Sequence, residues 1–288
     1  MESNMTVLMR ALNLSNNFIT WTSTSPDYDG TYAPESVQND SAVIVSDTGG
    51  VTIENIGKLG LEYDPVGLWL FDDNLNDSSG NGFTLTGTPG YTTIERDKQI
   101  GAIFGTSAWT RPSRDASLAI TGALTIEAVI RINFNGSGMG ICALGGNGSS
   151  EALNVAYFPI IGGGGEMSLY WESGAGIARQ VTSTAGVNLM PYGVPSHLVY
   201  TRSSDALAVV NFYVNGVNKF TGSATACTGS TDSTCRLRVG SDNVGLALID
   251  RGTVFTSLKI IAAELTPAQV VAEYNKVLGG KGIVYPVM

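Results

Sequence analysis

Short runs in which apolar and polar residues alternate follow one another along the chain from about residue 64 onward. In residues 124–132, Ile126 and Ala128 alternate with Thr125 and Glu127. Alternation places successive side chains on opposite faces of a strand, so that one face is buried. Asn211 and Tyr213 alternate with Phe212 and Val214 in the same way within residues 209–214, and further short strand-like runs lie at residues 67–71, 167–171 and 198–201. Because glycine-rich turns separate these runs and no helices come between them, the pattern predicts an all-β sandwich of two sheets.

One helix is predicted near the end of the chain. Thr266 suits an N-cap and Pro267 suits the first helical position, while the double glycine at 279–280 would end the helix. Earlier in the chain, the dipeptide Asn215-Gly216 favours a type I′ turn. We therefore expect the two strands that flank this dipeptide to form a hairpin.

The first 62 residues differ in composition from the rest of the chain. They are rich in Asn, Ser, Thr and Asp, and residues 43–45 and 51–53 suit a hairpin around the double glycine between them. So few apolar residues could hardly form a core of their own. We expect residues 1–62 to be a β-rich arm that docks on the main domain or on a partner, and residues 63–288 to form the main domain. The alternative, that the arm adds strands to the same domain, stays open.

The charge of the chain argues against one class of partner. Its formal net charge is −9, and only 14% of its residues are charged, with no cluster of Lys and Arg. A nucleic acid needs such a cluster to neutralise its phosphates, so no nucleic-acid partner is expected. No stretch reaches the roughly 18 apolar residues of a membrane span, so membrane insertion is not expected either. The amino terminus lacks the basic region and apolar core of a signal peptide, which predicts folding in the cytosol.

Four groups of motifs occur in a recognisable order along the predicted strands and helix. They are Gly-Leu-Trp-Leu-Phe-Asp at 67–72 with Ser-Ser-Gly-Asn-Gly at 78–82, Leu-Thr-Ile-Glu-Ala-Val-Ile-Arg at 124–131, Ser-His-Leu-Val-Tyr-Thr-Arg at 196–202 with Asn-Phe-Tyr-Val-Asn-Gly-Val at 211–217, and Leu-Arg-Val-Gly at 237–240 with the helical segment 263–274. In this order they resemble the laminin-G-like group of concanavalin A-like lectin-glucanase domains, over about residues 64–278. The resemblance implies a two-sheet jelly roll.

The same group contains both lectins and glycosidases, so the fold alone does not decide between binding and catalysis. Its glucanases carry Glu-x-Asp-x-x-Glu or a close variant on one strand, and this chain has no such run. Glu127 stands alone and is expected to face solvent. His197, the one histidine of the chain, matches a position that is structural in the group. A non-catalytic protein is therefore predicted, and a glycoside hydrolase of the same fold is the least favoured alternative.

Calcium is the one cofactor that the sequence suggests. Asp72, Asp73, Asn76 and Asp77 are oxygen donors in a turn-rich loop, and Ca²⁺ takes oxygen ligands. The resemblance counts against this site, because Thr256 replaces the aspartate that often begins the last strand of the group. The other interpretation of this segment is a loop held by hydrogen bonds.

Aromatic side chains at the surface would indicate glycan binding, because the C–H faces of sugars stack on aromatic rings. Trp109 lies in a predicted loop with Arg111 close by, and Tyr170, Trp171 and Tyr192 are further candidates. Neighbouring strand residues face opposite ways, so at most one of Tyr170 and Trp171 is available to a ligand. The alternative is that these rings belong to the core.

Two of the three cysteines lie in one loop. Cys227 and Cys235 are part of a segment rich in Ser, Thr and Gly. They either form a disulfide that closes the loop or remain two thiols, depending on the redox compartment. Cys142 is expected to be a small, buried apolar residue.

Two classes of function remain. In the first, the chain is a non-catalytic structural or adhesion protein of a larger assembly, and a phage virion fits best, because a domain of extracellular type follows a polar arm suited to docking. Capsid decoration, neck and tail roles are all compatible, with residues 1–62 contacting other virion proteins or further copies of the chain. In the second, it is a free or secreted extracellular carbohydrate-binding module. A cell-surface glycan is a candidate partner in either class.

Overall fold

A computed structural model describes most of residues 64–277 and, before them, four short strands. By its internal contacts the chain divides into two compact units, residues 1–61 and residues 62–288. Within 64–277, the residues that it does not describe are 95–98, 106, 112–115, 133–138, 146–155, 163–164, 173–177, 185–188, 190, 228–235, 242–248 and 250.

The smaller unit contains two antiparallel strand pairs. β1 (Met9–Leu12) pairs with β2 (Phe18–Trp21). β3 (Ile44–Val45) pairs with β4 (Val51–Thr52), which confirms the predicted pairing of these two segments.

The larger unit is built on an eight-stranded antiparallel sheet. Along the sheet the strands follow the order β17-β16-β15-β9-β19-β7-β6, and β5 also pairs with β19. Their bounds are β5 (Gly67–Trp69), β6 (Gly90–Ile94), β7 (Gln99–Ile103), β9 (Leu124–Arg131), β15 (Ser196–Arg202), β16 (Leu207–Val214), β17 (Val217–Thr225) and β19 (Val254–Ile261). The strand β9 lies inside the sheet, with β15 on one side and β19 on the other.

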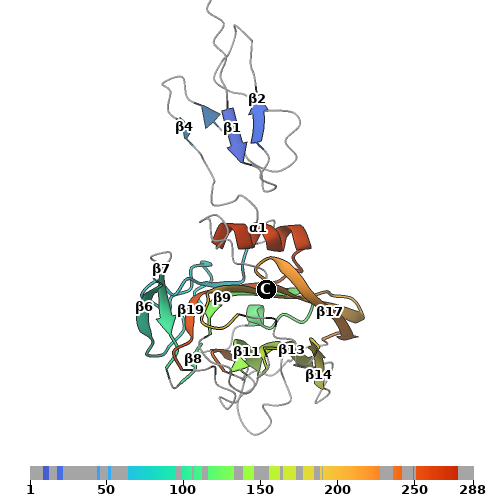
Figure 1. The fold of residues 1–288 in the computed structure, drawn as a ribbon. Coiled ribbons are helices and arrows are strands. Elements are labelled where there is room, and N and C mark those ends of the chain that lie inside the picture. Colours follow the sequence, from blue (N-terminus) through green and yellow to red (C-terminus); the bar gives the residue numbers. More distant parts are fainter. Residues whose placement is uncertain are drawn as a thin grey trace, which may run out of the picture. The chain divides into compact units, whose positions relative to one another are not determined.

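Two smaller sheets form the layer opposite the large sheet, where β11, β13 and β14 can be followed in Figure 1. One consists of β10 (Met139–Gly140), β12 (Phe158–Ile161), β13 (Met167–Glu172) and β14 (Ala178–Thr182). The other consists of β8 (Trp109–Thr110), β18 (Arg236–Val239) and β11 (Cys142–Gly145). A bridge between Leu144 and Tyr157 links the two sheets. The predicted fold class, an all-β jelly-roll sandwich with one short helix, is confirmed.

Helix α1 (Pro267–Val277) lies across the face of the large sheet that points away from the second layer (Figure 1). Its start is a reciprocal cap: the Thr266 backbone N–H donates to Gln269 Oε1 at 2.8 Å, and the Gln269 backbone N–H donates to Thr266 Oγ1 at 3.3 Å. Within the helix, Val270, Ala272 and Glu273 are buried. A 3₁₀ turn, η2 (Ala116–Leu118), is the other helical element of the described residues.

Aromatic rings fill one end of the space between the layers. Phe71, Phe104 and Phe255 surround Trp109, with ring centroids 5.2, 5.7 and 5.4 Å from the Trp109 ring. Trp109 is 1% exposed. Gly240 adjoins this cluster, and a Cβ atom there would lie 2.1 Å from Phe104, so only glycine fits. The cluster therefore depends on close contact between distant segments of the chain.

The hairpin that joins β16 to β17 has the predicted geometry. Asn215 has a φ of 52° and Gly216 a φ of 77°. Positive φ at both central residues is the signature of a type I′ turn, which matches the right-handed twist of the strands. The prediction made from this dipeptide is confirmed.

Replacing Trp109 by alanine tests the aromatic cluster. We expect Trp109→Ala to lower the free energy of unfolding by about 3–5 kcal/mol, because it removes a fully buried ring and leaves a cavity. Urea unfolding followed by circular dichroism gives this value. Val271→Ala, on the exposed side of α1, is the control and should change stability by no more than about 0.5 kcal/mol. A loss below about 1 kcal/mol in Trp109→Ala would contradict the burial of the ring.

Candidate functional site

Glu127 does not face solvent as predicted. It does point to the outer face of the large sheet, but α1 covers that face and leaves the residue 1% exposed. Lys259, opposite it on β19, places Nζ 3.2 Å from both carboxylate oxygens and also donates to Glu273 of α1. His197 of β15 lies on the other side, with Nε2 3.4 Å from Glu127 Oε1. The four side chains form one buried ionic cluster between sheet and helix.

Within the ionic cluster, the surroundings of Glu127 and Lys259 favour the charged form of both side chains. Burial alone would raise the pKa of Glu127, but the hydrogen bond and charge of His197 and the charge of Lys259 lower that pKa to about 2. For Lys259, burial lowers the pKa, and the carboxylates of Glu127 and Glu273 more than offset this and raise it. The cluster is thus a structural anchor for α1, and its carboxylates are closed off from a substrate.

The loop carboxylate of Asp77 is occupied by the loop itself. It accepts hydrogen bonds from the backbone N–H groups of Leu68 (3.0 Å), Ser79 (2.9 Å) and Phe83 (2.9 Å), and from the Ser79 hydroxyl (2.8 Å). Partial burial raises the pKa of Asp77, and these hydrogen bonds outweigh burial and lower it. This arrangement has the form of a hydrogen-bonded turn.

The other candidate calcium ligands surround the same turn. Asp72 Oδ1 accepts from Asn74 Nδ2 at 3.1 Å, and the Asn76 backbone N–H donates to Asn74 Oδ1 at 2.8 Å. Asp73 is exposed and has a φ of 74°. In the described part of the chain, no three His, Cys, Asp or Glu side chains group closely enough to hold a metal. Calcium binding here stays a prediction.

Two of the predicted glycan-binding aromatics are core residues. Trp109 was expected on a loop, but it lies in β8 inside the aromatic cluster described above. Trp171 is 0% exposed, and its Nε1 donates to the carbonyl of Thr225 at 2.9 Å. Neither ring is available to a ligand at the surface, because the strands that carry them turn these side chains inward.

The remaining candidates lie on separate elements. Tyr170 follows the expected alternation and is partly exposed on β13 beside the buried Trp171. Tyr192, before β15, is partly buried and packs against the core. Arg111, just after β8, lies over the ring of Phe83 at 5.9 Å. The role of these three residues in ligand binding stays a prediction.

Sequence reasoning gave no role to Arg202, which lies inside the sandwich at 0% exposure. Its guanidinium donates to the carbonyls of Ile120 (2.9 Å), Gly122 (3.1 Å) and Ala156 (2.9 Å) and lies 5.5 Å from the centre of the Trp171 ring. An arginine at the end of a strand ordinarily reaches solvent, so nothing in the local sequence indicates this position.

The structure describes two of the three cysteines, Cys142 and Cys227. The buried Cys227 thiol donates to the Ala156 carbonyl at 3.7 Å. Cys235 lies outside the described residues, and its predicted disulfide stays a prediction. Cys142 is fully buried, as expected, and burial raises the pKa of its thiol.

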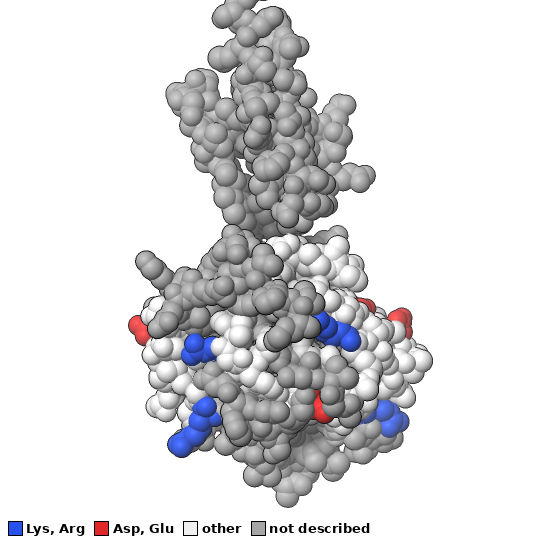
Figure 2. Space-filling view, viewed as in Figure 1, with Lys and Arg blue, Asp and Glu red and all other residues white. Residues whose placement is uncertain are grey.

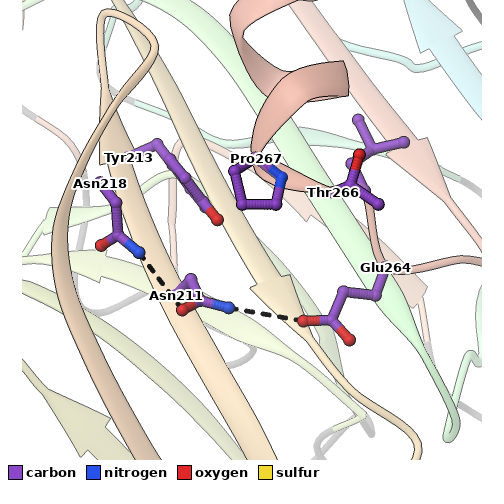
Figure 3. Close-up of a pocket in the computed structure, with 7 residues that line it drawn as sticks. Asn211, Tyr213, Asn218, Glu264, Thr266 and Pro267 are labelled. Carbon is purple, nitrogen blue, oxygen red and sulfur yellow. Dashed lines mark hydrogen bonds between the residues drawn. The ribbon is translucent and has the colours of Figure 1, made fainter.

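A groove with a volume of about 250 Å³ opens on the outer face of the large sheet, beside the start of α1 (Figure 3). Its lining residues are Asn211, Tyr213, Asn218, Glu264, Leu265, Thr266 and Pro267. Asn211 and Tyr213 alternate with core residues along β16, so both point outward. The groove could not be predicted from local sequence, because its lining combines the hairpin of β16 and β17 with a segment some fifty residues later in the chain. The outward-facing Asn211 and Tyr213 on β16 were the signal that the sequence offered.

Charged side chains are dispersed over the visible face of the domain. Figure 2 shows Lys and Arg lying apart from one another in the described part of that face. None of the described helices is long and apolar enough to cross a membrane.

The comparison with protein families decides the identity of the fold. The profile described as "Concanavalin A-like lectin/glucanases superfamily" matches residues 104–270. The chain belongs to this family. The predicted resemblance is thereby confirmed, and no curated protein matches the chain.

Solved structures share the concanavalin A-like fold at low sequence identity. Domain 4 of AbnA, a GH43 extracellular arabinanase from Geobacillus stearothermophilus solved in complex with arabinotriose, has a TM-score of 0.54 and 19% identity, over 73% of this chain and 98% of that domain. The Botulinum Neurotoxin Type G Receptor Binding Domain has a TM-score of 0.53 and 14% identity, over 74% and 51%. The binding domain of Paraclostridial Mosquitocidal Protein 1 has a TM-score of 0.53 and 12% identity, over 75% of this chain and 52% of that domain. The match spans about half of each toxin domain.

Removing the lysine of the ionic cluster should destabilise the protein strongly. Lys259→Met leaves Glu127 and Glu273 buried without their cation, and we expect it to lower the free energy of unfolding by about 3–5 kcal/mol. Lys276→Met is the matched control, because Lys276 Nζ lies 4.0 Å from Glu273 Oε1 but the Lys276 side chain is 49% exposed. This substitution should lower the free energy of unfolding by less than about 1 kcal/mol. Equal losses in urea unfolding of the two variants would contradict the anchoring role.

The same cluster predicts a response to acid. The pKa of Glu127 is lowered from 4.5 to about 2 on folding, so its contribution is complete above pH 4.5 and is lost as the pH falls toward 2. The midpoint of urea unfolding should therefore fall over this range. In Glu127→Gln the fall should be smaller, since one contributing carboxylate is absent. An identical pH dependence in both proteins would show that Glu127 does not contribute.

Proposed function

We propose that this protein is a non-catalytic binding protein, whose concanavalin A-like domain recognises a partner. One observation carries this proposal: the ionic cluster of Glu127, His197, Lys259 and Glu273 is buried between the large sheet and α1. A retaining glycosidase needs two carboxylates about 5 Å apart on either side of a bound substrate. Here both buried carboxylates bind the same Lys259, whose ammonium group takes up the space between them where a substrate would have to lie.

The proposal extends to the setting of the protein, a larger assembly such as a phage virion. In this setting residues 1–62 dock on other virion proteins or on further copies of the chain, in capsid decoration, neck or tail. The division of the chain into two compact units supports separate docking and recognition parts. The low content of charged residues, 14%, also suits a subunit packed among others.

The second candidate is a free or secreted extracellular carbohydrate-binding module. The groove beside α1 favours it, because hydroxyl, amide and carboxylate groups converge there in a small concave site. The fold shared with domain 4 of AbnA, solved with arabinotriose, is compatible with this candidate. Glycan binding and assembly do not exclude one another, since a subunit of an assembly can display a lectin-like domain.

The mass in solution separates the two settings. We expect light scattering to give a defined oligomer for the full chain and a monomer for a variant that starts at Tyr63, which keeps the larger compact unit with its core. This result would assign assembly to the first 62 residues. Folded monomers in both cases would remove the main support for the assembly and leave the free module.

A further inference from the structure

We propose that the groove beside α1 binds one ring of an uncharged saccharide, with Tyr213 and Glu264 as the residues that bond its hydroxyls. The inference rests on the proposed binding function and adds to it a site and a class of ligand. The volume of the groove, about 250 Å³, is below the roughly 300–1,000 Å³ of pockets that bind drug-sized ligands. The groove therefore holds one sugar unit of a glycan, and the remaining sugar units stay outside the groove.

The floor of the groove is fixed before any ligand arrives. The Asn211 side-chain amide donates to Thr201 Oγ1 at 3.2 Å and to Glu264 Oε1 at 3.4 Å. Its carbonyl oxygen accepts from Thr221 Oγ1 at 2.7 Å and from Asn218 Nδ2 at 3.4 Å. All four hydrogen-bonding positions of this amide are thus used within the protein. A site ordered in this way loses little side-chain entropy when it binds a ligand.

Two polar groups keep capacity for a ligand. The ring of Tyr213 is buried and the residue is 1% exposed as a whole, but its hydroxyl lines the groove. This hydroxyl points into the space between Pro267, Asn211 and Glu264 (Figure 3), and it makes no hydrogen bond to another described residue. The Glu264 carboxylate can accept about four hydrogen bonds, more than Asn211 and Thr201 supply. A phenol that donates beside a carboxylate that accepts suits the neighbouring hydroxyls of a sugar, each of which does both.

The charge of the groove selects against ionic ligands. Neither Lys nor Arg is among the lining residues, so an anion would meet Glu264 without a compensating cation. Partial burial, followed by the charge of Asp205, raises the pKa of Glu264, which shows that its surroundings disfavour concentrated negative charge. A single carboxylate in this setting is also a poor ligand set for a metal cation. An uncharged ligand with many hydroxyls remains.

An apolar surface completes the site. Pro267 is exposed at the first position of α1, and its ring borders the groove opposite Asn218 (Figure 3). The C–H groups of a sugar face can pack on this ring while the sugar hydroxyls reach Tyr213 and Glu264. The combination of an apolar contact with a few placed polar groups is typical of small-ligand sites.

Ligand titration of the full chain tests the proposal. The probes are four uncharged trisaccharides (arabinotriose, xylotriose, cellotriose and maltotriose), detected by saturation-transfer NMR and quantified by calorimetry. We expect at least one to bind, and Tyr213→Phe and Glu264→Gln each to weaken its Kd by roughly tenfold, the effect of one lost hydrogen bond. Tyr91→Phe, on β6 at the other edge of the large sheet, removes a matched hydroxyl and should leave the Kd unchanged.

Two results would overturn the groove as a sugar site: none of the four trisaccharides binds, or one binds with the same Kd in wild type, Tyr213→Phe and Glu264→Gln. Unfolding midpoints of the variants confirm that they are folded, and partly exposed Glu264 serves alone if the buried tyrosine variant is unstable. The mass measurement is independent of this test. If the protein is an oligomer that binds no sugar, the sugar site is refuted and the assembly role stands. If it is a monomer that binds no sugar, the sugar site and the assembly role are both refuted.

Discussion

A carboxylate in an inner strand of a sheet must find a cation and hydrogen bonds, and the outer side of this sandwich follows from that requirement. Glu127 meets it through Lys259 and His197, which the two neighbouring strands place beside it. Lys259 extends the cluster to Glu273, so charge as well as apolar contact holds α1 on the sheet. The position of α1 fixes the segment that precedes it, and this segment forms one wall of the groove.

Much of the fold could be predicted because its signals are local. Alternation identified β9 and β16, the Thr266-Pro267 pair identified the start of α1, and Asn215-Gly216 identified the hairpin turn. Alternation also assigned Glu127 correctly to the outer face. It could not reveal that a helix covers that face, because the covering depends on residues more than a hundred positions away.

The candidate site was less predictable for the same reason. Trp109 was assigned to a loop, because Gly105 and Pro112 flank a two-residue strand whose pairing partners, β18 and Thr86, are distant in the sequence. The direction of the Asn211 and Tyr213 side chains followed from alternation, yet the groove that they line also requires Glu264, which the chain brings near only after passing through the second layer. Local patterns therefore gave the faces of strands, and contacts between distant segments decided which faces are buried.

Arg202 couples the two layers of the sandwich energetically. Its guanidinium is carried by β15, while the carbonyls that accept its hydrogen bonds belong to the segments around Ile120, Gly122 and Ala156, and its ring partner Trp171 belongs to the second layer. Without these carbonyls the guanidinium would be buried in an apolar interior with no hydrogen-bond acceptors, at a large cost in free energy. Burying this charge with only one layer present would therefore be costly, so Arg202 makes the stability of each layer depend on the presence of the other.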